Sequence, residues 1–310
     1  MKKIALSIAA LAVSAGAALA ADLPSRKGPP VLPPPPPPPP MWTGFYVGLN
    51  AGGGWANNNN INTVGGPFFI NPAFPAGAGA VANALAFSAS NSLTGGNNGG
   101  FIGGGQIGYN YQFYNNFVVG IEADIQGVAG SSSTATTAGV VSLAPWGFPN
   151  ESYASVASAR QSIDYFGTVR GRLGWLATPT LLIYGTGGLA YGGVNVNTAF
   201  MAQESLGPAT YPAVFGGTNF SDTRVGWTAG GGVEWMFWPN WSAKVEYLYY
   251  DLGNVTTNGA LTQINAVAAP PVVWGAVGTQ TTTRFNGNLV RAGLNYHFNW
   301  GAPAPVVAKY

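Results

Sequence analysis

The chain has 310 residues, of which only 7% are charged, against about 25% in ordinary soluble domains. It contains no cysteine, which excludes disulfides and thiol chemistry. Its formal net charge is only +2, and removal of Lys2 and Lys3 would leave a balanced chain with ten basic and ten acidic residues. This balance excludes the strongly basic surface that is typical of nucleic-acid-binding proteins.

The first twenty residues have the pattern of a secretory signal peptide. Two lysines precede an apolar stretch over Ile4–Ala17, and Ala18–Ala20 forms a small-residue cleavage site. The apolar stretch is too short to span a bilayer as a helix. We therefore predict a cleaved signal peptide over residues 1–20 and export of the chain, with an uncleaved anchor as the alternative. After residue 20 no unbroken apolar run reaches the roughly 18 residues of a membrane helix.

Residues 21–41 are predicted to form a proline-rich periplasmic linker. Eight consecutive prolines occupy Pro33–Pro40, and such a run adopts the stiff polyproline II conformation. In one interpretation the linker is a simple tether. In the other it reaches the cell wall, where Arg26 and Lys27 would contact anionic groups.

Beyond the linker, apolar and polar residues alternate in segments of about a dozen residues. In Trp241–Asp251, for example, Val245 and Tyr247 lie on one face, whereas Lys244 and Glu246 lie on the other. Such alternation predicts strands with one apolar and one polar face. Glycines in the fifth strand leave its register open. The eight predicted strands are Gly44–Ala56, Phe101–Phe113, Phe117–Gly127, Ile163–Ala177, Leu181–Val194, Arg224–Phe237, Trp241–Leu252 and Arg284–Phe298.

The connections between these strands alternate in length. Three tight turns, at 114–116, 178–180 and 238–240, alternate with four long loops at 57–100, 128–162, 195–223 and 253–283. Charged faces and an even number of strands favour a barrel with its apolar side toward lipid. The sequence therefore predicts an all-β protein, an eight-stranded antiparallel transmembrane barrel over residues 42–298. We expect short periplasmic turns, four long extracellular loops and a periplasmic tail over residues 299–310.

Eight charged residues lie on the faces predicted to point into the barrel. One interpretation is a selective pore lining. The other is a packed network of ion pairs, because eight strands leave an interior only about wide enough for side chains. Balanced charge favours the network. The residues are Glu122, Asp124, Arg170, Arg172, Glu234, Lys244, Glu246 and Arg291.

Aromatic residues gather near the short-turn end, where an aromatic girdle at the membrane boundary is expected. They are Trp42, Phe45, Phe113, Trp175, Trp235, Phe237, Trp241 and Phe298.

The first and fourth loops carry apolar residues and no charge, so we expect them to pack together as a cap over the mouth. Ala78–Ser90 could form a short helix within that cap, although glycines make a disordered first loop the alternative.

Two candidate sites, one for a dinucleotide and one for a metal ion or catalysis, are not supported by the sequence. Gly185–Ala190 matches a loose dinucleotide fingerprint, but the residues that follow cannot supply the helix that this motif requires. His297 is the only histidine, and without a second histidine or a cysteine a metal site or a nucleophile–base pair is hard to build. We therefore predict no enzymatic activity, no cofactor and no metal.

Eight motifs resemble, in order, the alphaproteobacterial outer-membrane immunogenic proteins, an OmpA-type barrel family often labelled porin-like. They include WTGFYVGLNAGGGW, VVGIEADIQG, DYFGTVRGRLGW, WSAKVEYLYYDLG and NLVRAGLNYHF. The resemblance implies an outer-membrane location, and it covers Trp42–Phe298. The last strand also fits the assembly signal of such barrels, in Arg291, Gly293, Tyr296 and Phe298, although that signal usually ends the chain.

Three functions remain open: a structural envelope protein that displays its loops, a narrow porin for small solutes, and a recognition protein whose loops bind a partner. The loops hold only Glu151, Arg160, Glu204 and Asp222 as charged residues, and these do not indicate a ligand. We expect structural display with at most a narrow pore. The expected partners are outer-membrane lipid, lipopolysaccharide and the barrel-assembly machinery, with the cell wall as a further candidate through the linker and no nucleic acid.

Overall fold

The computed structural model describes residues 42–96, 99–114, 116–206, 209–265 and 272–298. The predicted signal peptide (1–20), linker (21–41) and tail (299–310) lie outside the described residues.

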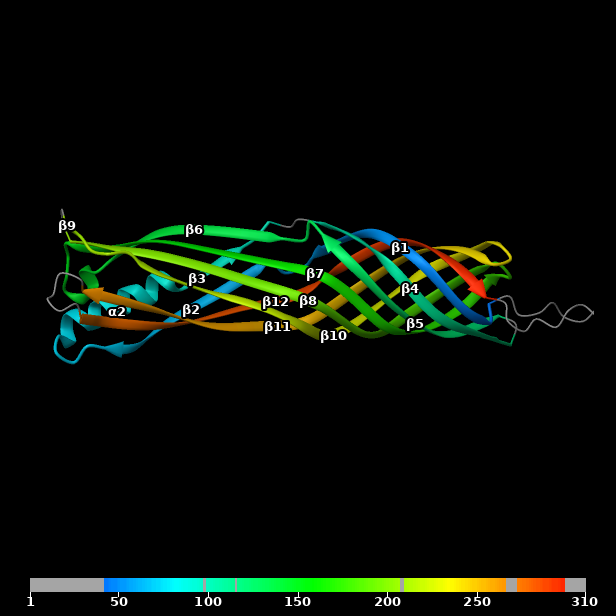
Figure 1. Ribbon diagram of the computed structural model, residues 1–310, viewed down its shortest axis with the longest axis horizontal. Coiled ribbons are helices and arrows are strands. Elements are labelled where there is room, and N and C mark those ends of the chain that lie inside the picture. Colours follow the sequence, from blue (N-terminus) through cyan, green and yellow to red (C-terminus); the bar gives the residue numbers. More distant parts are fainter. Residues whose placement is uncertain (1–41, 97–98, 115, 207–208, 266–271, 299–310) are drawn as a thin grey trace, which may run out of the picture. The chain divides into compact units, whose positions relative to one another are not determined.

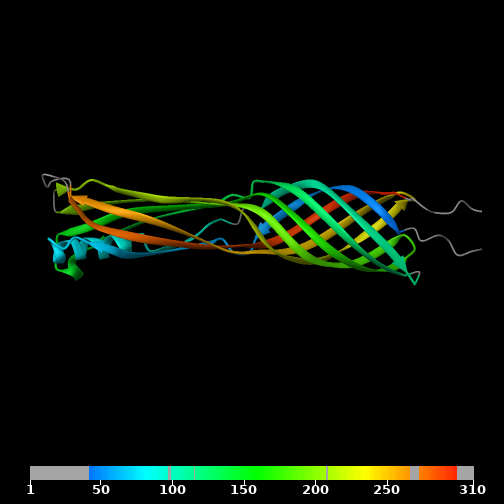
Figure 2. The same ribbon diagram turned by 60° about the horizontal axis from the view of Figure 1, so that its bottom comes forward.

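Eight antiparallel strands form a closed ring, as the alternating pattern predicted (Figures 1 and 2). The ring has the order β1-β4-β5-β7-β8-β10-β11-β12, and β1 pairs with β12 to close it. Closure leaves no strand edge within the ring, as a hydrocarbon environment requires. The strands are β1 (Gly44–Ala56), β4 (Gly100–Phe113), β5 (Phe117–Ala129), β7 (Glu151–Thr178), β8 (Leu181–Leu206), β10 (Val214–Trp238), β11 (Trp241–Asn265) and β12 (Val272–Phe298).

Five of these strands continue far beyond the ends predicted from the sequence. The prediction for β1 matches the structure, whereas β7, β8, β10, β11 and β12 are 25 to 28 residues long. The long connections are present, but most of their length is regular strand. They contain many Thr and Val residues, which suit a pleated sheet, together with Ser and Ala, and they lack the charged alternation that marks the ring.

The continued strands extend the same sheet beyond the ring, and we call this part of the sheet the distal extension. It contains the described residues of 57–96, 131–162, 195–223 and 254–283. Here β2 (Asn60–Ile70) pairs with β12, β3 (Asn91–Thr94) pairs with β2, and β6 (Ser133–Ser142) pairs with β7. Because no pairing joins β3 to β6 among the described residues, the sheet is open in the distal extension. The short β9 (Ala209–Thr210) pairs with β8, and a 3-10 turn, η1 (Ala144–Trp146), follows β6.

One α-helix of the described residues, α2 (Pro75–Ala89), lies against the inner side of the distal extension (Figures 1 and 2). It begins with proline, which suits a first helical turn, and it buries Val81, Leu85 and several alanines. These residues pack with Leu143, Tyr153 and other apolar side chains of the sheet. The predicted helix is thus confirmed, as is the packing of the first loop against the fourth, because β2 pairs with β12. No described helix is long and apolar enough to cross a membrane.

Two bulges change which residues face inward as the strands leave the ring. In β7 the register shifts between Ile163 and Tyr165, and in β11 it shifts between Asp251 and Asn254. Since side chains alternate with a period of two, one extra residue moves the following positions to the opposite face. The inward positions of β7 are therefore odd-numbered in the distal extension and even-numbered in the ring.

Candidate functional site

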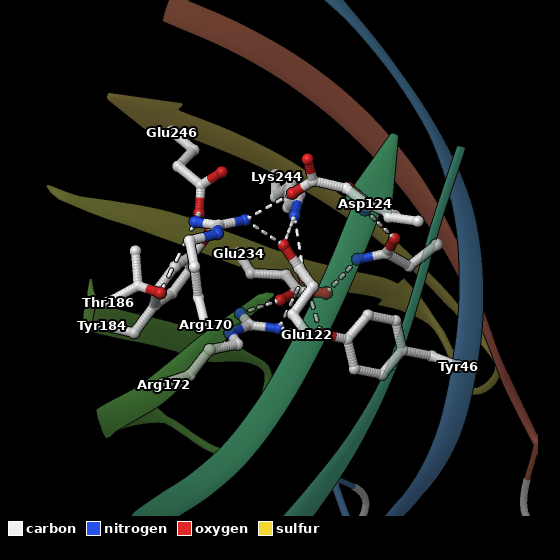
Figure 3. A network of polar contacts seen from close by, with 12 residues as sticks. Tyr46, Glu122, Asp124, Arg170, Arg172, Tyr184, Thr186, Glu234, Lys244 and Glu246 are labelled. Atoms are coloured by element: carbon white, nitrogen blue, oxygen red, sulfur yellow. Dashed lines mark hydrogen bonds and ion pairs between the residues drawn. The ribbon is translucent and has the colours of Figure 1, made fainter. Parts of the chain in front are cut away.

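Eight charged side chains project into the ring and meet in its interior (Figure 3). They lie on β5, β7, β10, β11 and β12, and each residue is at most 4% exposed. We call this set the lumen network. The structure thus brings together all eight residues that the sequence placed on inward faces, which are Glu122, Asp124, Arg170, Arg172, Glu234, Lys244, Glu246 and Arg291.

Arg170 links carboxylates on opposite sides of the ring. Its Nη2 lies 2.5 Å from Glu122 Oε1 and 3.0 Å from Asp124 Oδ2, both on β5. Its Nη1 donates to Glu246 Oε1 on β11 at 2.8 Å. Nε completes the fork by donating to the Thr168 hydroxyl at 2.8 Å. One guanidinium therefore links β7 to β5 beside it and to β11 across the ring, in the planar geometry that suits arginine.

Glu122 is the shared acceptor of the network. Besides Arg170, it accepts from Lys244 Nζ at 2.8 and 2.9 Å, and from the Tyr46 hydroxyl at 2.7 Å. Arg291 contributes a second bridge, with Nη2 at 2.8 Å from Asp124 and 2.7 Å from Glu246. Each charge thus has an opposite partner, which a buried ion requires.

Arg172 connects this core to a second group nearer the turns. Its Nη2 lies 2.5 Å from Glu234 Oε2, and its guanidinium lies over the Tyr184 ring at 4.0 Å. Glu234 also accepts from Ser242 Oγ at 2.5 Å, and Ser242 Oγ lies 2.8 Å from His297 Nε2. Serine, histidine and glutamate thus meet, but the serine hydroxyl donates to the carboxylate and all three are nearly inaccessible. This is not the arrangement of an activated nucleophile.

Sequence reasoning missed the neutral members of this arrangement. Tyr46, Tyr184 and Ser242 each bind a network carboxylate. All three have even-numbered positions. Each lies on the inward face, together with the charged residues of its own strand or of a paired strand. The alternation of inward and outward positions along a strand was therefore a signal that could have identified them.

Apolar clusters fill the ring on both sides of the lumen network. Near the turns, Trp42, Val118, Leu182 and other side chains pack together, and Trp42 Nε1 donates to the Pro179 carbonyl at 3.0 Å. Toward the distal extension, a larger cluster includes Ile102 and Phe166. The described part of the lumen therefore holds three successive layers of packed side chains.

The chain matches a protein-family model described as an outer membrane protein beta-barrel domain, over residues 5–298. It belongs to this family. It is also 35% identical to a 31 kDa outer-membrane immunogenic protein of Brucella melitensis, over 83% of this chain and 84% of that protein. A 22 kDa outer membrane protein of Rhizobium leguminosarum bv. viciae is 31% identical over 48% of this chain and 52% of that protein. These relatives place the protein in the outer membrane.

Among solved structures, OprG of Pseudomonas aeruginosa aligns with 83% of this chain and 97% of its own, at 9% identity and a TM-score of 0.35. Ail of Yersinia pestis aligns with 80% of this chain and 99% of its own, at 10% identity and a TM-score of 0.26.

The outer face of this outer-membrane barrel is apolar, with an aromatic girdle at the turn end. Phe45, Trp175, Trp235 and Trp241 are 41–54% exposed on the ring's outer surface, as expected for side chains at a membrane boundary. Trp42 is a correction to the predicted girdle. It is fully buried in the lumen, because it lies just before β1 and folds back over the ring's opening onto Pro179.

The residues of the predicted assembly signal divide between the two faces of β12. Arg291 joins the lumen network, and a side chain on Gly293 would come within 3.3 Å of Lys244. Tyr296 and Phe298 are adjacent on the other face, with their rings 5.1 Å apart in an edge arrangement. The aromatic members therefore lie on the lipid side of the strand.

The candidate sites that the sequence argued against have no catalytic geometry in the described residues. Gly185–Ala190 lies wholly within β8, so no helix follows it. Among the residues that the structure describes, no group of three or more His, Cys, Asp or Glu side chains is placed to hold a metal ion.

A further buried acid lies outside the ring, in the distal extension. Glu204 is 5% exposed and accepts from the Tyr153 hydroxyl at 3.0 Å and from Gln263 Nε2 at 3.3 Å. The pKa of Glu204 is raised to about 7, mainly by burial and to a smaller extent by the nearby Glu151, against the lowering effect of the Tyr153 hydrogen bond. Burial also raises the pKa of Tyr153. The environment of Glu204 therefore favours the protonated acid.

Proposed function

We propose that this outer-membrane barrel is a structural envelope protein that holds a folded sheet-and-helix domain outside the cell. In this proposal the ring is an anchor with at most a narrow pore, and the protein is not an enzyme. The curated relatives support an outer-membrane barrel, and the further step to a structural display role is ours.

The main support for this proposal is that packed side chains fill the lumen of the ring. A packed ion network lies between two apolar clusters, and four negative residues balance four positive ones. Water-filled channels need more strands than eight, because an eight-stranded ring is about wide enough for its own side chains. A neutral, paired interior also gives no preference for one sign of ion.

Single-channel recording of the refolded barrel in a planar bilayer tests the proposal. We expect a small or intermittent conductance with weak ion selectivity. A large and steadily open channel would instead support the general porin function, and the lumen network would then have to open in the membrane.

The display part of the proposal requires the distal extension to face the outside. An epitope tag inserted between Pro149 and Asn150, both exposed beside η1, should be detected on intact cells. A tag beside Pro239, at a tight turn of the ring, should be detected only after permeabilisation. The reverse pattern would contradict the orientation.

The aromatic and terminal features indicate the partners of such an anchor. The apolar outer face would contact outer-membrane lipid and lipopolysaccharide, and Tyr296 and Phe298 on β12 would be read by the barrel-assembly machinery. Pulse-chase insertion of a variant with serine at both positions tests the second point. Insertion at the normal rate would show that the assembly machinery does not need them.

A recognition function is the second candidate, and one observation favours it. Val64, Phe68, Phe74 and Phe87 are 54–67% exposed, although all lie in the distal extension and outside the ring. Apolar side chains that gather outside a membrane often mark an interaction surface. If this surface binds a partner, cells that display the barrel should adhere to a hydrocarbon phase, and serine at Phe68 and Phe87 should reduce adhesion without changing the amount displayed.

A further inference from the structure

We propose that the junction between the ring and the distal extension holds a binding site for a small, mainly apolar ring compound that carries one polar group. The site is a pocket whose space, together with the open solvent at its mouth, is about 650 Å³. Pockets for small molecules are typically concave and mostly apolar, with a few polar groups that fix the orientation of the ligand.

The pocket exists because the strands end at different heights. Three strands of the ring stop here: β1 at Ala56, β5 at Ala129 and β4 at its first residue, Gly100. The neighbouring β7, β11 and β12 continue into the distal extension. The inner faces of the long strands are therefore left without the opposing wall that covers them in the ring.

The floor of the pocket is apolar and aromatic. Ile102, Phe166, Tyr250, Phe285 and Leu289 line it, and each is at most 5% exposed. The rings of Phe166 and Tyr250 are 4.9 Å apart. These side chains belong to the apolar cluster that closes the lumen above the network. The pocket therefore ends on packed side chains, and this geometry suits binding more than passage.

Polar residues also line the pocket, and most of them are held by hydrogen bonds within the chain. They are Asn58, Asn59, Ser131, Ser133, Gln161, Ser162, Arg284 and Asn286. Gln161 is held by hydrogen bonds to Asn59 and Thr283. Ser133, which also lines the pocket, is 5% exposed, and its hydroxyl has no hydrogen-bond partner among the described residues. A buried hydroxyl without a partner is costly, so a polar group on a ligand would find a favourable contact there. Enclosed cavities lined by aliphatic and aromatic side chains bind benzene, and the floor of this pocket offers side chains of the same types.

Methyl NMR of the barrel in lipid nanodiscs, titrated with 4-methylphenol and with toluene, tests the proposal. Methyl signals of Ile102 and Leu289 should shift and saturate, and each should show nuclear Overhauser contacts to the probe ring. Leu49 and Leu294, which are 73% and 51% exposed on the lipid side, report partition of the probe into the bilayer. The hydroxyl of 4-methylphenol should tighten binding over toluene by roughly threefold to tenfold. Ser133→Ala should remove that difference.

A matched pair of variants separates the pocket from the outer surface. Val128 lines the pocket, whereas Ile125 on the same strand is 56% exposed outside the ring. Val128→Trp should weaken the saturable shift at Ile102 and Leu289 by roughly tenfold or more, and Ile125→Trp should leave it unchanged. Equal saturation in both variants, or probe contacts only to Leu49 and Leu294, would overturn the proposal. The contacts measured in the unmodified protein decide the question if Val128→Trp does not fold.

Discussion

The ring and the distal extension are built from the same long strands, yet charged side chains lie inside the ring and apolar side chains fill the distal extension. In the ring the outside is apolar, with Leu49 and Leu173 more than 60% exposed, and the inside holds eight charges. In the distal extension the inside is apolar around α2, with Leu85 and Val277 fully buried. The comparison shows that the surrounding solvent, more than the strand itself, determines which face must be polar.

Strand pairing differs between the two regions for the same reason. The ring must close because lipid cannot satisfy an exposed strand edge. The distal extension has free edges at β3 and β6, and there water can take the place of a neighbouring strand. The bulges in β7 and β11 lie where the closed ring ends and the open distal extension begins.

The largest effect is expected in the ring, from replacing Arg170 and Arg172 together by alanine. Glu122 and Glu234 would then be buried with fewer partners, and removal of one member of a buried ion pair costs about 3–5 kcal/mol. We expect a clear loss of heat stability, measured by the gel-shift transition of the folded barrel, and a rise in cation conductance. Unchanged stability would mean that the lumen is hydrated and that the carboxylates do not depend on these arginines.

The distal extension should respond to loss of its apolar core without any effect on the ring. Leu85→Ala removes a fully buried side chain of α2, which should cost about 2–5 kcal/mol of local stability. Hydrogen exchange should become faster in the distal half of β7 and stay slow in its ring half. Phe87→Ala on the same helix is the control, because Phe87 is 67% exposed. Equal acceleration in both halves would show that the two regions unfold together.

The buried acid of the distal extension should make that region depend on pH. The pKa of Glu204 is about 7 in the folded protein, against about 4.3 in an unfolded chain. Between these values the unfolded state releases a proton that the folded state retains, so stability is highest at low pH and falls as pH rises toward 7. Protease resistance of the distal extension should therefore be greater at pH 5 than at pH 8.

The Glu204→Gln variant provides the control for this pH effect, because it should be equally resistant at both pH values. Glu151→Gln should keep most of the dependence, because Glu151 only adds to a shift caused mainly by burial. A pH dependence that persists in Glu204→Gln would assign the effect to another group.

The sequence predicts the ring well because membrane strands must alternate. Glu122, Asp124 and their partners were placed on inward faces by parity alone, and the pairing of Glu122 with Arg170 across β5 and β7 follows that parity. Family resemblance then adds the location. Ends of strands were predicted less well, because segments such as 195–206 carry a single charge, Glu204, and no repeated charged alternation that marks a face.

Long-range packing explains what sequence patterns missed. Trp42 looks like a girdle residue beside Phe45, and only the fold back onto Pro179 places it in the lumen. The Asp251–Asn254 bulge breaks the period of two at Gly253, which has a φ of 79°. Glycine often marks a bulge, but the strands hold so many glycines that this one does not stand out in the sequence. The hydrogen bond between Glu204 and Tyr153 joins two predicted loops that have no common motif.

The smallest effect is expected at the rim, where Arg284 pairs with Asp251 beside the bulge of β11. The Arg284 side chain is 50% exposed, so water screens this pair, and exposed pairs contribute little to stability. Arg284→Ala should lower the stability of the ring far less than the Arg170 and Arg172 double variant does, and added salt should remove the difference. Urea unfolding at low and high salt measures both. A loss of stability as large as that of the Arg170 and Arg172 double variant would mean that water does not reach the Arg284–Asp251 pair. The boundary between the ring and the water-exposed distal extension would then lie beyond the bulge.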